Sequence, residues 1–157
     1  MYKKILVATD GSNVANGAFE SALQLAKEQA AQLFVLYVIE SPKFYLPDPG
    51  IDPTLVYEAQ AAEGERVKRQ ARDHLKKESV QGQFVMADNF FSDHSTVEQI
   101  QHTADELHAD LVILGTHGRS GFKRLMLGSV AEAFVRMSTR PVLLVPQKSA
   151  VVSSATV

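Results

Sequence analysis

Short apolar runs alternate along the chain with longer segments in which apolar residues recur every three or four positions. A nearly continuous apolar run is typical of a strand buried on both faces of a parallel sheet, and the longer spacing predicts an amphipathic helix. The runs predict five strands, at Ile5–Thr9, Leu33–Ile39, Gln83–Ala87, Leu111–Leu114 and Pro141–Pro146. Four helices are expected between them, at Val14–Ala31, from Pro53 to about Lys77, from the Ser95–Glu98 capping box onward and at Val130–Ser138.

Each predicted helix has an apolar face that we expect to pack against the sheet. Asp52 before Pro53 is typical of an N-cap followed by proline at the first helical position. Gly64 weakens the middle of the second helix, because glycine is a poor helix former. The expected inner faces are, helix by helix, Ala15, Phe19, Ala22, Leu23, Ala26 and Ala30; Leu55, Val56, Ala59, Val67, Ala71 and Leu75; Val97, Ile100, Ala104 and Leu107; and Val130, Ala133, Phe134 and Met137.

The alternation of strand and helix predicts an α/β fold, a Rossmann-like parallel sheet with right-handed crossovers and helices on both faces. A ligand of such a sheet lies beyond the carboxyl ends of the strands, where Asp10, Val38 and Gly115 are expected. At 157 residues the chain has the length of one domain. Ser41–Pro53 holds four of the six prolines and is expected to be an exposed loop. We expect 147–157 to be a disordered tail.

Charge and cysteine content narrow the function classes. Lys and Arg total 16 against 18 Asp and Glu, so the net charge of −2 disfavours binding to nucleic acid or to an anionic membrane. There are no cysteines, which excludes a disulfide framework, thiolate metal sites and cysteine catalysis. The apolar run before Asp10 is too short for a signal peptide or a membrane span. These features together predict a soluble, cytoplasmic protein.

A glycine-rich stretch, GTHGRSGFKRLMLGS, follows the fourth predicted strand. Gly115 permits a sharp turn off the strand, and Gly118 and Gly121 let backbone N–H groups approach an anion. Gly128 and Ser129 begin the last helix, whose free N–H groups and dipole favour phosphate. Positive charge is supplied nearby by Arg119, Lys123 and Arg124. The pattern indicates a two-part phosphate site, although glycines that merely turn a strand into a helix remain the alternative.

The stretch is neither a P-loop nor a G-x-G-x-x-G loop. Its spacing, G-x2-G-x9-G-[ST], is matched by Gly115, Gly118, Gly128 and Ser129. With these residues the chain resembles a universal stress protein of the nucleotide-binding type. KILVATDGS, LFVLYVIE, ADLVILGTHG and PVLLVP resemble the first, second, fourth and fifth strands of that family, so the resemblance extends from Lys3 to Pro146.

The resemblance implies a nucleotide-binding domain over residues 1–146, with strand order 3-2-1-4-5, binding of ATP, ADP or AMP, and dimers. It implies that Asp10 contacts the ribose, that the Val38 backbone reads the adenine edge and that Ala8 lines the base pocket. Ribose and phosphates would be held by Gly115, Gly118, Arg119, Ser120, Gly121, Gly128, Ser129 and Val130. A Mg²⁺ ion could accompany the phosphates, with Asp10 as the nearest carboxylate.

Three functions are weighed on these residues. A nucleotide-binding regulatory protein, acting through a dimer or an unknown protein partner, is favoured by the complete glycine motif. A nucleotide-free stress adaptor is the second. A slow nucleotide hydrolase is the third, and no catalytic residue is assigned, because the carboxylates and lysine usual in phosphoryl transfer are not visible. His117 in the loop could donate to a phosphate or simply face solvent.

Two surface expectations complete the sequence-based picture. Val142–Val145 is wholly apolar and lies at the sheet edge in the implied strand order, which favours pairing with the same strand of a second subunit. Phe90 and Phe91 lie in a segment longer than the turn common in the family. They are expected to pack against a helix, with a partner surface as the alternative.

Overall fold

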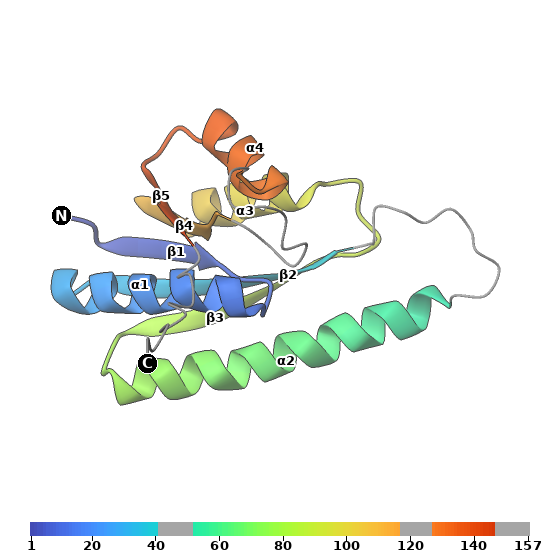
Figure 1. Cartoon of the computed structure of the whole chain (residues 1–157), viewed down its shortest axis with the longest axis horizontal. Helices are drawn as coiled ribbons and strands as arrows, with labels where there is room; N and C mark the ends of the chain where they lie inside the picture. The colour runs from blue at the N-terminus through green and yellow to red at the C-terminus, as the bar shows by residue number, and fades with distance from the viewer. Residues whose placement is uncertain (41–51, 117–126, 147–157) are drawn as a thin grey trace, which may run out of the picture.

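The computed structural model describes residues 1–40, 52–116 and 127–146, and leaves the side chains of residues 13–16 undescribed. Within these residues the chain forms one five-stranded sheet of order β3-β2-β1-β4-β5 in which all neighbouring strands are parallel. This confirms the predicted fold class and strand order. The elements are β1 (Lys4–Ala8), α1 (Asn13–Gln29), β2 (Gln32–Glu40), α2 (Pro53–Lys77), β3 (Gly82–Asn89), α3 (Thr96–Glu106), β4 (Leu111–Gly115), α4 (Ser129–Met137) and β5 (Val142–Val145), as labelled in Figure 1.

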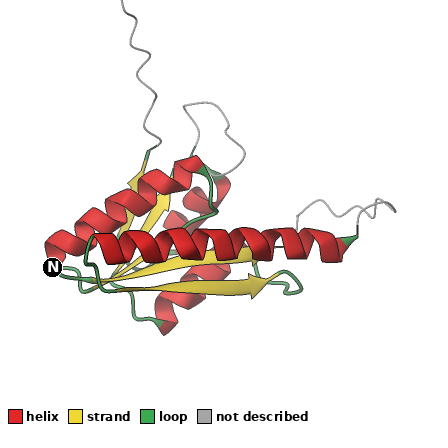
Figure 2. Ribbon diagram, turned by 90° about the horizontal axis from the view of Figure 1, so that it is seen from below, coloured by secondary structure: helices red, strands yellow, loops and turns green. Residues whose placement is uncertain are grey.

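Helices cover both faces of the sheet, and the side chains of β1 divide between them. Ile5 and Val7 pack in one apolar cluster with residues of α1 and α2. Leu6, between them, packs in a second cluster with Ile100 of α3 and Phe134 of α4. Figures 1 and 2 show α2 and α1 on one side of the sheet and α3 and α4 on the other. The period-two alternation of a strand therefore divides a continuous apolar run between apolar clusters on the two faces of the sheet.

The helix starts predicted from capping residues are confirmed. Asp52 is the N-cap of α2, where its side chain accepts from the Thr54 N–H at 2.9 Å, and Pro53 follows at the first helical position. At α3 both hydrogen bonds of the Ser95–Glu98 capping box are present. These local signals fix where the helices begin, because each satisfies backbone N–H groups that the helix leaves unpaired.

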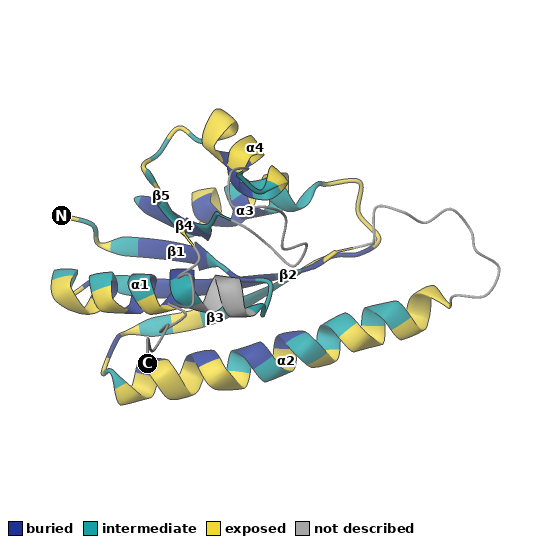
Figure 3. Ribbon diagram, viewed as in Figure 1, coloured by how far each residue is buried: buried dark blue, intermediate teal, exposed yellow. Residues whose placement is uncertain are grey.

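Some expected inner-face residues lie outside the core. Leu55 and Ala59 are exposed because the first turns of α2 extend beyond the ends of the strands (Figures 1 and 3). Ala30 is also exposed, since α1 ends at Gln29 and Ala30 takes a left-handed φ of 52°. In α4 it is Ala131, rather than Ala133 or the 41% exposed Met137, that is buried beside Phe134. Val130, as expected, is half-buried and packs against the same cluster as Phe134.

Gly64 was expected only to weaken α2, but it lies buried where the helix approaches the sheet. A Cβ at this position would be 2.8 Å from the Met86 methyl carbon and 3.1 Å from the Tyr37 ring. The glycine therefore lets α2 pack closely on β2 and β3. Its helix-weakening effect is offset by the contact it permits.

The strand β5 occupies the sheet edge, beside β4. Its four residues are less buried than those of β1 or β4, and Leu143 is 39% exposed. The expected location of the apolar edge is thus confirmed, whereas the expected dimer stays a prediction. In the described parts of the chain, the helices include none that could cross a membrane.

Candidate functional site

The turn that follows β1 is closed by short-range hydrogen bonds. The Gly11 N–H donates to the Thr9 hydroxyl at 3.2 Å, and the Ser12 N–H donates to Asp10 Oδ1 at 2.9 Å. Gly11 has a φ of +78°, a left-handed conformation that a side chain resists. The turn thereby fixes the direction of the Asp10 carboxylate at the carboxyl end of the strand.

The two ends of the glycine-rich stretch meet at the carboxyl end of β4. Gly115 is the last residue of this strand, and the Thr116 N–H donates to the Val145 carbonyl at 3.0 Å. The Gly128 N–H then donates to the Thr116 carbonyl at 2.7 Å. The stretch between them is thus closed at its base, directly before α4 begins.

The helix α4 starts at a glycine. Gly128 occupies the N-cap position with extended φ and ψ of −60° and 146°, and no side chain of the described residues caps the helix there. Ser129 is the first helical residue and therefore does not occupy the capping position. A helix N-terminus with uncapped N–H groups attracts an anion through those groups and the helix dipole.

The sheet brings these pieces to one edge. β1 lies between β2 and β4, with Val7 in register with Ile113, so the ends of β1 and β4 are neighbours. The helix that follows β1, α1, lies on one face of the sheet, and the helix that follows β4, α4, lies on the other (Figure 1). This is the switch point at which ligands of open α/β sheets bind.

Three predicted apolar site residues lie on the same face of the sheet. Ala8 of β1, Val38 of β2 and Val130 of α4 are all half-buried, and all three pack against the cluster that contains Leu36 and Phe134. Val38 lies two residues further along β2 than Leu36, the partner of Ala8. Ala8, Val38 and Val130 therefore form an apolar surface near the Asp10 turn and the start of α4, on the α3 and α4 side.

The structure places only part of the predicted site. Ala8, Asp10, Val38, Gly115, Gly128, Ser129 and Val130 are described and lie at the carboxyl edge of the sheet. Gly118, Arg119, Ser120, Gly121 and His117 lie outside the described residues, as do residues 41–51 of the proline-rich segment and the tail. The expected loop does not reach Pro53, because Asp52 and Pro53 already begin α2.

Sequence reasoning missed two residues of α2 at this edge. Arg66 Nη2 donates to the Gly11 carbonyl at 3.4 Å, and its Nε donates to Glu63 Oε2 at 2.8 Å. The hydrogen bond to Glu63 raises the pKa of the Arg66 guanidinium further above its already high value, so it stays charged. Both residues belong to a run of interleaved acidic and basic residues on α2, a pattern typical of a solvent-exposed helix face, so no local sequence signal distinguishes them.

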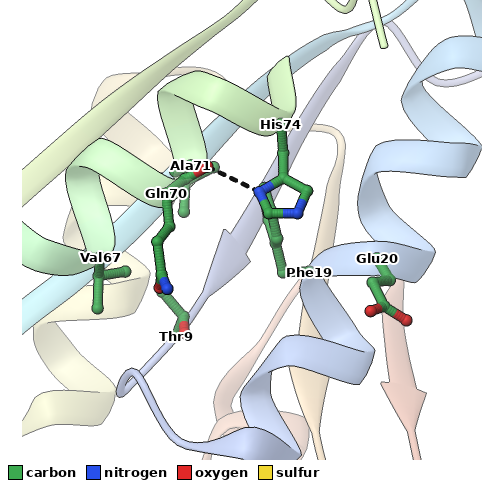
Figure 4. A pocket seen from close by; sticks show the side chains of 8 residues that line it. Thr9, Phe19, Glu20, Val67, Gln70, Ala71 and His74 are labelled. Atoms are coloured by element: carbon green, nitrogen blue, oxygen red, sulfur yellow. Dashed lines mark hydrogen bonds between the residues drawn. The ribbon is translucent and has the colours of Figure 1, made fainter. Parts of the chain in front are cut away.

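A separate cavity of about 110 Å³ lies on the other face, between α1 and α2 (Figure 4). His74 Nδ1 lies 2.8 Å from the Gln70 carbonyl, and the His74 ring meets Phe19 edge-on with centroids 5.7 Å apart. The lining residues are Thr9, Phe19, Glu20, Val35, Val67, Gln70, Ala71 and His74. Among the described residues, no three histidine and carboxylate side chains gather in a way that could hold a metal.

A model of the universal stress protein family matches residues 1–146 of the chain. The chain belongs to this family. Relatives include the universal stress protein MJ0531 of Methanocaldococcus jannaschii, 33% identical over 146 residues, which cover 92% of this chain and 82% of the relative. The universal stress protein YxiE of Bacillus subtilis is 32% identical over 154 residues, with 92% and 99% covered.

Solved structures of the family share the fold. A universal stress protein family member from Burkholderia pseudomallei superposes with a TM-score of 0.76 at 32% identity, covering 92% of this chain and 96% of the other. A universal stress protein crystallised in complex with cAMP gives a TM-score of 0.66 at 26% identity, covering 93% and 98%.

Proposed function

We propose that this universal stress protein binds an adenine nucleotide at the carboxyl edge of its sheet and acts as a regulatory stress protein through a nucleotide-dependent surface. The observation that carries the proposal is the convergence of Asp10, the uncapped start of α4 and the apolar surface of Ala8, Val38 and Val130. A base needs an apolar surface, a ribose needs a hydrogen-bond acceptor and a phosphate needs free N–H groups. The cAMP complex of a relative supports the nucleotide class.

Each part of the ligand has its own protein group in this proposal. The adenine ring lies against Ala8 and Val38, and the Asp10 carboxylate accepts from the ribose hydroxyls. The phosphates lie at the N–H groups of Ser129 and Val130. A Mg²⁺ ion, where present, is held mainly by the phosphates, as is usual for this ion.

We also propose that two copies associate through β5 in the manner expected from the sequence. Leu143 is 39% exposed on this edge strand, whereas Leu144 packs against the core cluster of Phe134. Leu143→Lys therefore perturbs the surface without placing a charge in the core. Light scattering should show a dimer for the natural protein and a monomer for the variant, and an undisturbed dimer in the variant would exclude this interface.

Titration calorimetry with ATP tests the nucleotide proposal. Asp10→Asn keeps an oxygen for the Ser12 N–H but removes the charge, so it should weaken ATP by about 1.5–3 kcal/mol, the scale of a hydrogen bond to a charged group. A 2′,3′-dideoxy nucleotide should lose a similar amount against the natural protein and little against the variant. Asp73→Ala, at an exposed aspartate of α2, is the matched control and should bind as the natural protein does.

Gly128→Val tests the phosphate end separately. A β-branched side chain at the N-cap would crowd the approach to the first N–H groups of α4 and should abolish binding while the fold survives. If the natural protein takes up no adenine nucleotide at millimolar concentration, the nucleotide-free adaptor is the better description.

A further inference from the structure

The turn that carries Asp10 is supported from behind by α2. The Arg66 guanidinium donates to the Gly11 carbonyl at 3.4 Å, a contact between residues 55 positions apart. The same guanidinium is held by Glu63 in a two-pronged pair, with Nε to Oε2 at 2.8 Å and Nη2 to Oε1 at 2.5 Å. Its Nη1 donates to the Gln70 side chain at 2.8 Å. Contacts within α2 therefore fix the orientation of the guanidinium group that donates to the turn.

There is no room between the turn and the helix at Gly11. A Cβ on this residue would lie 2.7 Å from Glu63 Oε1 and 3.0 Å from a methyl carbon of Val67. Gly11 also has a left-handed φ of +78°, so a glycine is favoured here, and its backbone lies directly against α2. Displacement of this part of α2 would displace the turn, since interiors packed this closely transmit movement.

We propose that Arg66 and Glu63 are positioning residues for the ribose-reading turn: the Glu63-held guanidinium fixes the Gly11 carbonyl and thereby the direction of the Asp10 carboxylate. The expected effect of these residues on nucleotide affinity rests on the proposed function, whereas their effect on the conformation of the turn does not. Glu63 acts through Arg66, because its carboxylate presents the guanidinium as a planar fork rather than touching ligand.

Arg66→Ala removes the donor to the Gly11 carbonyl. Because the 3.4 Å contact is longer than a usual N–H···O hydrogen bond, the variant should weaken ATP binding about two- to threefold, the low end of the range for one hydrogen bond. The loss should be absent for the 2′,3′-dideoxy nucleotide, which makes no ribose contact that depends on Asp10. Arg72→Ala, at an exposed arginine of the same helix, removes an equal charge and should leave both affinities unchanged. Equal losses for both nucleotides, or equal losses in both variants, would overturn the proposal.

Amide hydrogen exchange in the nucleotide-free protein gives a readout that does not depend on ligand. The Gly11 and Ser12 N–H groups, which close the turn through Thr9 and Asp10, should exchange faster in Arg66→Ala and not in Arg72→Ala. Unchanged exchange at both amides would refute the positioning role whatever the binding data show. Faster exchange with no ATP binding by the natural protein would uphold this role and reject the proposed function.

Glu63→Gln completes the test and guards against a misfolded alanine variant. The amide leaves one acceptor oxygen for the guanidinium and removes the charge that orients it. Turn exchange should rise less than in Arg66→Ala, and the double variant should resemble Arg66→Ala alone, because Glu63 acts through the arginine. Effects that simply add in the double variant would show that Glu63 does not act through Arg66.

Discussion

Replacing Gly64 with alanine tests how closely α2 is seated on the sheet. Alanine is a better helix former than glycine by about 0.8–1.0 kcal/mol, so the backbone term favours the variant. The new methyl group, however, would lie 3.1 Å from the ring of Tyr37, which is 1% exposed, and 2.8 Å from the mobile end of Met86. Met86 can move aside, but the buried Tyr37 ring cannot move without disturbing its neighbours. Overpacking of this kind costs about 1–3 kcal/mol, so we expect Gly64→Ala to destabilise the protein by about 0–2 kcal/mol.

Gly17 provides the matched control, since it is also a helical glycine but a Cβ there would meet no described atom of another part of the chain within 4 Å. Gly17→Ala should therefore stabilise the protein by about 0.8–1.0 kcal/mol. Urea unfolding of the two variants measures the difference directly, provided that the dependence on urea concentration is unchanged. Equal stabilisation by both substitutions would refute the close packing of α2 against β2 and β3.

Further substitutions test other parts of the molecule. Gly11→Ala should destabilise by about 1–2 kcal/mol from its left-handed φ alone, measured by urea unfolding, and unchanged stability would contradict that turn geometry. Phe134→Ala should cost about 3–5 kcal/mol in the same assay, because the ring is fully buried between α4 and the sheet, and a loss below 1 kcal/mol would mean that α4 does not cover this face. The backbone N–H and hydroxyl of Ser95 donate to Glu98 and lower the pKa of its carboxyl. The stabilisation that the ionised Glu98 carboxylate gives is therefore complete above the ordinary glutamate pKa and is lost as pH falls through the lowered pKa. The difference in free energy of unfolding between the natural protein and Glu98→Gln should consequently shrink on acidification. A gap that does not depend on pH would show that the capping box does not hold the ionised carboxylate.

The apolar runs were sufficient to predict the three central strands, β2, β1 and β4, because a strand buried on both faces needs apolar residues at nearly every position. The helix starts at Asp52 and Ser95 could be predicted for a similar reason, since capping is a short-range interaction. The strand order came from the family resemblance. Periodicity alone does not distinguish the parallel sheets that the same elements could form.

The residues whose positions or contacts the sequence did not predict also have a physical explanation. Leu55 has the spacing of a core residue, but it lies on a turn of α2 beyond the sheet, and sequence spacing does not record where a sheet ends. The sequence predicts only that Gly64 weakens α2. Its role in close packing could not be predicted, because its neighbours Tyr37 and Met86 lie on two other strands, far from it in the sequence. Arg66 could not be identified from the sequence for the same reason, since its contact with Gly11 exists only once α2 has packed on β2 and β3.

The most direct test of nucleotide binding at the carboxyl edge is the change of backbone amide chemical shifts on addition of ATP. We predict that the largest changes fall at the ends of β1, β2 and β4 and at the start of α4, and include Asp10, Gly115 and Ser129. The amides around the separate cavity, such as that of His74, should be little affected. Large changes confined to the cavity between α1 and α2, or no changes at millimolar ATP, would contradict the account.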